Sequence, residues 1–280
     1  MSTKLTFYVI ATKSYLDYAR DLISDLKSRS TEEFKIQVIL LTDVGNPFQS
    51  EYPKTSCFEL TTSLIPSYGW PEATLFRFKI MLAHQDLAEG EIVAYIDADM
   101  RVISSLSTKM FSEPLANSTN CRIALVKHPG YAFRGRPYQF FIKSRFGPWG
   151  INQSSSAWVP RKLRLTYVCG GLFWGDSTSF FQLCRNLDQQ ISADELNGIR
   201  AKHNDESHLN RWSASNQHVF MGPEWVYAPG YKNLQHLTPI ISVVHKPLNF
   251  VRISSNGEAA NSSFLRKSLN LFHRWIKKQT

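Results

Sequence analysis

Apolar strands that alternate with amphipathic helices constrain the fold of this chain more than any other feature. Residues 4–12 and 34–43 have the apolar composition of strands, and residues 13–28 between them carry apolar side chains at helical spacing. A second helix is expected from Pro71, which suits a helix start, to a stop at Gly90. This alternation predicts a mostly parallel α/β sheet, which binds ligands in the crevice beyond the carboxyl ends of its strands.

A third apolar strand, from Ile92 to Ile96, ends in two aspartates, Asp97 and Asp99. Side chains alternate faces along a strand, so both carboxylates are expected on one side. Two like charges this close repel each other unless something positive lies between them. The spacing predicts a cation site, although Asp is also common in turns and a lone D-x-D pattern is frequent by chance.

The second half of the chain continues the alternation. The connection from Pro129 to Pro160 is rich in Gly, Pro, Ser and aromatic residues, which is typical of a functional loop or lid. Around it we expect three strands (121–128, 166–175 and 239–246) and two helices (177–196 and 203–212).

No internal repeat and no clean linker divides the sequence. We therefore expect one continuous domain over residues 1–260. Its first half, about residues 1–125, and its second half, residues 126–260, would flank a cleft. A basic amphipathic helix is expected over residues 261–280, with an apolar stripe that either docks on the rest of the chain or lies on an anionic membrane surface.

Composition narrows the class of protein. A hydrophobic fraction of 43% supports a buried core, and the net charge of +9 suits nucleic acid, an anionic membrane face or a phosphorylated ligand. The basic residues gather in 133–147, 161–164 and 265–278, and for each cluster alone a solvated surface is the simpler interpretation. Without C-x-x-C spacing, a leader or a membrane-spanning apolar run, we expect a cytoplasmic protein that is at most peripheral to a membrane.

A second acidic cluster, Asp205 and Glu206, is flanked by His203 and His208. The histidines stand five residues apart, a spacing that does not put two zinc ligands on one helix face as H-E-x-x-H does. Ordinary hydrogen bonding is the simpler role for the histidines. The carboxylates still require an explanation.

The segment LNGIRAKHNDESHLNRW resembles the signature of glycosyltransferase family 6, the retaining enzymes that include the blood-group A and B transferases and the α-1,3-galactosyltransferases. The resemblance implies a GT-A type fold, with a Rossmann-like nucleotide-binding half fused to an acceptor-binding half. Seven further segments, between about residues 7 and 252, resemble family motifs: VIATKSY, YIDADM, KHPGY, SSAWVP, GGLFWGDS, GPEWVYAP and VHKPLNFVR.

The resemblance assigns the first acidic pair to a divalent metal. Asp97 and Asp99 match the family's D-x-D pair, which holds Mn²⁺, with Mg²⁺ as a substitute, against the diphosphate of a UDP-sugar. Lys246 and Arg252 match basic residues that close over the diphosphate. Arg77 matches an arginine that braces the acidic pair and the donor, the alternative being a surface salt bridge.

The resemblance also implies a nucleotide site and a catalytic carboxylate. It places Ile10, Ala11 and Tyr15 at the uracil, and it places Ala98, between the two aspartates, in the nucleotide site as well. For Tyr15 the alternative is a structural role in the core.

Glu206 matches the family's glutamate beneath the anomeric carbon, where it acts as a nucleophile or as electrostatic support. Asp205 matches an aspartate that hydrogen-bonds the donor sugar, or it caps the helix.

Donor and acceptor choice follow from flanking positions. Gly170 and Leu172 flank Gly171 where the family tunes its donor, and the bulk of the leucine favours galactose over N-acetylgalactosamine. His128 matches a histidine that touches the acceptor sugar.

Two positions on the acceptor side depart from the family pattern. His203 replaces a tryptophan and Ala228 an aspartate, so we expect an acceptor other than that of the animal enzymes. The animal enzymes also carry a membrane anchor and stem. We therefore expect a bacterial or viral enzyme that acts on an oligosaccharide or glycolipid.

These features together predict a metal-dependent retaining transferase that moves galactose, or a related hexose, from a UDP-sugar into an α-1,3 linkage. One alternative is a nucleotidyltransferase that uses the same D-x-D strand end, but it would not need the motif NDESHLN. The other is a basic nucleic-acid-binding protein. We expect no nucleic-acid partner, because the acidic clusters would repel phosphates without a metal.

Overall fold

The computed structural model describes residues 4–117, 122–132, 148–244 and 246. The basic segment 133–147, Arg252 and the expected C-terminal helix over 261–280 lie outside these described residues.

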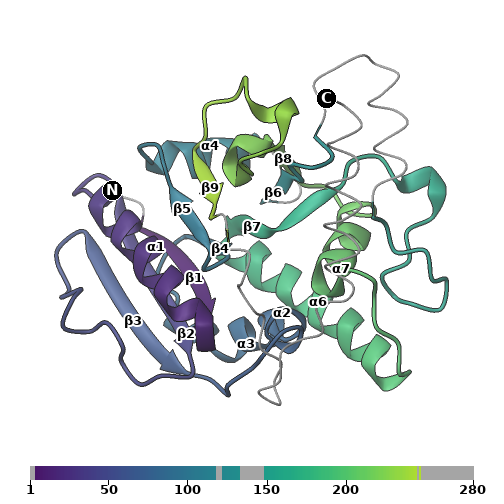
Figure 1. The fold of residues 1–280 in the computed structure, drawn as a ribbon, viewed down its shortest axis with the longest axis horizontal. Helices are drawn as coiled ribbons and strands as arrows, with labels where there is room; N and C mark the ends of the chain where they lie inside the picture. Colours follow the sequence, from purple (N-terminus) through teal and green to yellow (C-terminus); the bar gives the residue numbers. More distant parts are fainter. Residues whose placement is uncertain (1–3, 118–121, 133–147, 245, 247–280) are drawn as a thin grey trace.

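A seven-stranded sheet forms the centre of the molecule (Figure 1). Neighbouring pairs β1–β2, β2–β3, β1–β4 and β6–β8 are parallel, and β7 is antiparallel to β4 and β6. The predicted mostly parallel α/β sheet is confirmed. In spatial order the strands are β3 (Phe58–Leu64), β2 (Lys35–Thr42), β1 (Lys4–Ala11), β4 (Ile92–Ile96), β7 (Val168–Asp176), β6 (Ile123–Lys127) and β8 (Val219–Met221).

Helices cover both faces of the sheet. One face packs on α1 (Leu16–Arg29) and α4 (Thr108–Ala116), through apolar side chains such as Leu22 and Phe111. The other face packs on α3 (Arg77–Ala83), α6 (Ser177–Leu196) and α7 (Asn204–Ser213). Because both faces are covered, β1, β2 and β4 are buried almost throughout, which explains their continuous apolar sequences.

A small second sheet brings the end of the described chain back to the centre. Strand β5 (Met100–Val102) pairs antiparallel with β9 (Ile241–Val243). The Val244 amide then donates a hydrogen bond to the Asp99 carbonyl (2.9 Å). This pairing places Lys246 beside the end of β4.

Two local expectations were wrong. Asp97–Asp99 does not continue the strand: it forms a turn between β4 and β5, closed by a hydrogen bond from the Met100 amide to the Asp97 carbonyl (3.2 Å). The turn, and not strand alternation, orients the two carboxylates. The helix expected from Pro71 to Gly90 is also interrupted, since α2 (Glu72–Leu75) and α3 are separated at Phe76, and a 3-10 turn follows at Gln85–Leu87.

None of the helices within the described residues has the length and hydrophobicity needed to span a bilayer.

Candidate active site

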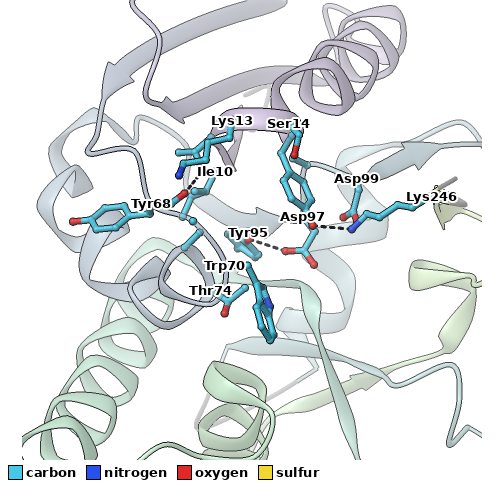
Figure 2. Close-up of a pocket in the computed structure, with 15 residues that line it drawn as sticks. Ile10, Lys13, Ser14, Tyr68, Trp70, Thr74, Tyr95, Asp97, Asp99 and Lys246 are labelled. Atoms are coloured by element: carbon cyan, nitrogen blue, oxygen red, sulfur yellow. Dashed lines mark hydrogen bonds and ion pairs between the residues drawn. The ribbon is translucent and has the colours of Figure 1, made fainter. Parts of the chain in front are cut away.

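A pocket opens at the carboxyl ends of β1 and β4 (Figure 2). Strands β2 and β3 lie on one side of β1 and β4 lies on the other, so the strand order of the sheet reverses here. This is the crevice where open α/β sheets bind ligands. The lining residues are Ile10, Thr12, Lys13, Ser14, Tyr15, Tyr68, Gly69, Trp70, Ala73, Thr74, Tyr95, Asp97, Ala98, Asp99 and Lys246.

Asp97 is held by the strands on either side of it. Its amide donates to the Gly171 carbonyl (2.8 Å), because antiparallel β7 runs beside the end of β4. Its Oδ1 accepts from the Tyr95 hydroxyl (2.7 Å) and lies 3.5 Å from Arg77. Burial raises the pKa of Asp97, and the nearby Asp99 carboxylate adds to the rise while Arg77 opposes it. A cation beside Asp97 would lower this pKa and so stabilise the charged carboxylate.

Asp99 has a cation beside it in this structure. Its Oδ2 lies 2.5 Å from the Lys246 ammonium, which also donates to the Tyr15 hydroxyl (2.9 Å). Figure 2 shows Lys246 and Asp99 side by side at one edge of the pocket. The turn therefore attracts positive charge.

The acidic turn fits a divalent metal. Asp97 and Asp99 supply oxygen ligands, which Mg²⁺ and Mn²⁺ prefer. Gly171 leaves room beside them, since a Cβ there would lie 2.9 Å from Asp97 Oδ2. Among the described residues there is no group of three or more His, Cys, Asp or Glu side chains suited to a metal. Such a site needs further oxygens from a ligand, as Mg²⁺ sites built from one or two carboxylates and substrate phosphates do.

Arg77 joins the two acidic clusters. It is buried, and its guanidinium lies 3.0 Å from Asp205 and 3.5 Å from Asp97. It also donates to the Gly170 carbonyl (2.8 Å), and its charge lies over the Tyr95 ring at 4.6 Å. The surface salt bridge considered for Arg77 is therefore wrong. Its apolar neighbours on α2 and α3 bury it.

Helix α7 presents the second acidic cluster to β7. The Gly170 amide donates to Glu206 Oε2 (3.0 Å), and Glu206 is half-buried. Asn210, one turn later, accepts from the Val168 amide (2.8 Å) and donates to the Val168 carbonyl (2.9 Å). This two-bond clamp fixes the distance between α7 and β7, and so the place of Glu206.

Asp205 is not the helix cap that was considered, because the N-cap of α7 is His203. Its carboxylate is buried against Arg77. Burial raises the pKa of Asp205 to about 7, against the opposing charge of Arg77. A hydrogen-bond donor from a bound sugar would favour the charged form.

His208 has the ordinary structural role expected of it. Its ring is buried, with Nδ1 3.3 Å from the Ser156 hydroxyl and Nε2 3.7 Å from Asp194. Asp194 in turn accepts from the Ser155 hydroxyl (2.5 Å) and the Ser156 amide (2.6 Å). Burial lowers the pKa of His208 to about 4. These contacts tie the loop before β7 to α6 and α7.

An aromatic cluster lies near Glu206. The His128 ring lies 4.9 Å from Tyr131 and 5.8 Å from Tyr167, whose ring contacts Trp149 at 5.1 Å. His128 Nδ1 accepts from the Gly130 amide (3.0 Å), so in the neutral ring the proton is on Nε2. Burial lowers the pKa of both His128 and His203, and Glu206 lies close enough to each to oppose this.

Sequence comparison identifies the family. Residues 70–255 match the profile of glycosyltransferase family 6, which is well over half of the chain. The chain belongs to glycosyltransferase family 6. It is therefore a glycosyltransferase of a family that moves a sugar from a nucleotide sugar, and the family's enzymes generally use a divalent metal.

Three named family 6 relatives are distant in sequence. The histo-blood group ABO system transferase 1 of Rattus norvegicus is 23% identical over 92% of this chain and 68% of its own length. The globoside alpha-1,3-N-acetylgalactosaminyltransferase 1 of Mus musculus is 29% identical over 60% of this chain and 44% of its own. Its counterpart in Homo sapiens is 25% identical over 80% and 59%. This chain spans only about half to two thirds of their lengths.

The remaining predicted family 6 residues divide by position. Ile10 and Tyr15 line the pocket, with Ala98 between the aspartates, while Ala11 is fully buried in β1. Gly170 lies against Asp205 and Glu206. Leu172 has no exposed surface and packs in the core with Ala98 and Met100, so it has no direct access to a donor.

Sequence reasoning missed several residues of this family 6 site. Asn210 ends the motif NDESHLN, and that position was the one available signal for its role. Cys169 precedes Gly170, and its thiol, whose pKa is raised by burial, lies within electrostatic range of Glu206 and Asp97. Tyr167 and Trp149 border the long connection, where no periodicity marked them.

Proposed function

We propose that this chain is a metal-dependent retaining glycosyltransferase. It would move a hexose from a UDP-sugar to a sugar hydroxyl, with an α-1,3 linkage. One observation carries the proposal: Arg77 joins an acidic turn at the nucleotide crevice to an acidic helix start beside an aromatic cluster. A diphosphate, a reacting sugar and an acceptor can occupy three adjoining places along this line.

The donor would lie along the pocket, with its base near Ile10 and Tyr15. Asp97 and Asp99 would hold the metal, which when bound neutralises charge that builds on the departing diphosphate. Lys246 would pair with the diphosphate, together with Arg252 from the chain beyond the described residues. Arg77 and Asp205 would hold the sugar in place.

Glu206 would face the anomeric carbon. The Gly170 amide holds one carboxylate oxygen, and the half-buried position of Glu206 leaves it able to meet a sugar. It acts either as the nucleophile of a double displacement or as electrostatic support during front-face attack. His128 and His203, whose pKa values are lowered by burial, would contact the acceptor.

The donor sugar follows from two competing indications. In the sequence the bulk of Leu172 favours galactose, and because this side chain is fully buried it would act on the donor only through its neighbours in β7. Two of the relatives are named for transfer of N-acetylgalactosamine with an alpha-1,3 linkage. We retain galactose as the proposal, with both sugars in the test.

The test is UDP release from a panel of UDP-sugars that includes both, measured with Mn²⁺ and with EDTA. We expect release from one sugar that requires Mn²⁺, and an α-configured product by NMR. Release that EDTA does not change would contradict the metal requirement. Absence of release from every donor would leave the chain without the proposed activity.

A further inference from the structure

The Lys246 ammonium holds two groups that the proposed donor would need. It lies 2.5 Å from Asp99 Oδ2, donates to the Tyr15 hydroxyl at 2.9 Å, and lies 4.6 Å from the centre of the Tyr15 ring. Asp99 is one of the two proposed metal ligands and Tyr15 the proposed uracil contact. Lys246 thus joins Asp99 to Tyr15 at one edge of the pocket (Figure 2).

This bridge is built into the fold and is not a loose surface pair. The Lys246 side chain is 21% exposed and that of Asp99 13%, so water screens the pair less than it screens an ordinary surface ion pair. The backbone beside it is fixed as well, by the hydrogen bond from the Val244 amide to the Asp99 carbonyl and by the pairing of β5 with β9. The backbone two residues before Lys246 is therefore tied directly to the backbone of Asp99.

We propose that Lys246 competes with the divalent metal for Asp99, so that the free enzyme binds the metal weakly and takes it up together with the donor diphosphate. This inference rests on the proposed function. A metal at Asp99 would meet a cation already hydrogen-bonded to the same oxygen. Like charges at this distance repel, so the lysine must move before the metal binds well.

The diphosphate removes the obstacle by giving the lysine a new partner. Its phosphate oxygens offer the ammonium negative charge within the same pocket, and Asp99 is then released to the metal. Tyr15 is released in the same movement. Because coupling between two ligands is reciprocal, the metal must strengthen diphosphate binding by the same factor as the diphosphate strengthens metal binding.

The experiment measures binding and not turnover. Free Mn²⁺ is followed by electron paramagnetic resonance during titration of the native chain and of Lys246→Met, each with and without UDP. Without UDP, we expect Lys246→Met to bind Mn²⁺ about tenfold more tightly than the native chain, which corresponds to about 1.4 kcal/mol. With saturating UDP the order should reverse, because the variant lacks the charge that pairs with the diphosphate.

Two further variants separate charge from folding. Lys246→Arg keeps the positive charge and should keep the weak metal binding of the native chain. Tyr15→Phe keeps the ring but removes the hydroxyl that holds the ammonium, so metal binding without UDP should tighten by about two- to threefold. Tyr15→Phe also tests the inference independently if Lys246→Met does not fold.

The outcomes distinguish the inference from the proposed function. If the native chain binds UDP with Mn²⁺, but Lys246→Met and Tyr15→Phe bind Mn²⁺ alone no more tightly than the native chain, competition by Lys246 is wrong and the proposed function stands. If the native chain does not bind UDP even with Mn²⁺, both fail.

Discussion

The two acidic pairs of this enzyme look alike in sequence but are built differently. Asp97 and Asp99 lie in an open turn, where their side chains are 33% and 13% exposed and face a pocket. Asp205 and Glu206 lie at the start of a packed helix, where the Asp205 side chain is 5% exposed and Glu206 is held by a backbone amide. Asp99 pairs with a lysine, whereas Asp97 and Asp205 pair with Arg77.

The difference indicates separate tasks. An open turn that already attracts an ammonium suits a metal and a diphosphate, which enter from solvent. A carboxylate fixed by a backbone amide suits work on one atom of a bound sugar, which requires fixed geometry. Arg77 contacts both pairs, so it should matter to each.

Loss of Arg77 should break both pairs at once and give the largest effect. Arg77→Met leaves Asp205 buried without its partner, and breaking a buried ion pair in this way costs about 3–5 kcal/mol. Urea unfolding should show this loss in the midpoint. Arg77→Met combined with Asp205→Asn should recover much of the stability but no transferase activity. A double variant as unstable as the single one would show that Asp205 does not depend on Arg77.

Acid should lower the stability of the protein through His208, which lies on α7, the helix that carries Asp205 and Glu206. Its folded pKa of about 4 lies below the unfolded value of about 6.5, so the unfolded chain binds more protons between these values. This stability is present above pH 6.5 and lost as the pH falls towards 4, by about 2 kcal/mol between pH 7 and 5.

Urea unfolding at these two pH values measures the loss, and His208→Gln is the matched control. The variant should lose that part of the pH dependence. If the free energy of unfolding changes equally with pH in both proteins, the buried and neutral state of His208 is contradicted.

Substitution of Asn210 should disturb Asp205 and Glu206 on α7 but not the acidic pair in the turn. Asn210→Leu keeps the size of the side chain but leaves the Val168 amide and carbonyl without their partner, at a cost of about 1–3 kcal/mol. Glu206 then loses its fixed distance from Gly170, so kcat should fall by about 10- to 100-fold. Binding of UDP with Mn²⁺, measured by calorimetry, should stay within twofold of native. A matching loss of UDP binding would mean that the two pairs are not separate.

A methyl group at Gly171 should disturb Asp97 and Asp99 in the turn but not the acidic pair on α7. In Gly171→Ala the new Cβ would lie 2.7 Å from the end of Met100 and 2.9 Å from Asp97 Oδ2, so Asp97 must move. We expect about tenfold weaker Mn²⁺-dependent UDP binding. Gly170→Ala is the control, because its Cβ meets Asp205 at an ordinary 3.4 Å. Equal losses in both variants would show that the strand, and not the space beside Asp97, determines the effect.

The sequence predicts the parts of the fold that repeat a long pattern. The apolar strands β1, β2 and β4 and helices α1 and α6 follow from periodicity. Strand β3 carries polar residues at the sheet edge, β5 and β8 have three residues each, and α4 contains Pro114, so none of them has a clear pattern. These elements form because tertiary neighbours complete their hydrogen bonds.

The candidate site shows the same division. Motif positions predict Asp97, Asp99, Asp205 and Glu206, and the structure connects them through Arg77. The contact of Lys246 with Asp99 joins residues far apart in the chain through the β5–β9 pairing, and no local pattern encodes it. The aromatic cluster around His128 is likewise assembled from separate segments.

The most direct test of this division compares Asp99→Asn with Glu206→Gln. Each protein is titrated with UDP in the presence of Mn²⁺, and transfer is measured on the same preparations. We predict that Asp99→Asn loses Mn²⁺-dependent UDP binding, and that Glu206→Gln keeps that binding while transfer falls by about a thousandfold or more. Equal loss of UDP binding in both variants, or native transfer by Glu206→Gln, would contradict the separate tasks of the two acidic pairs.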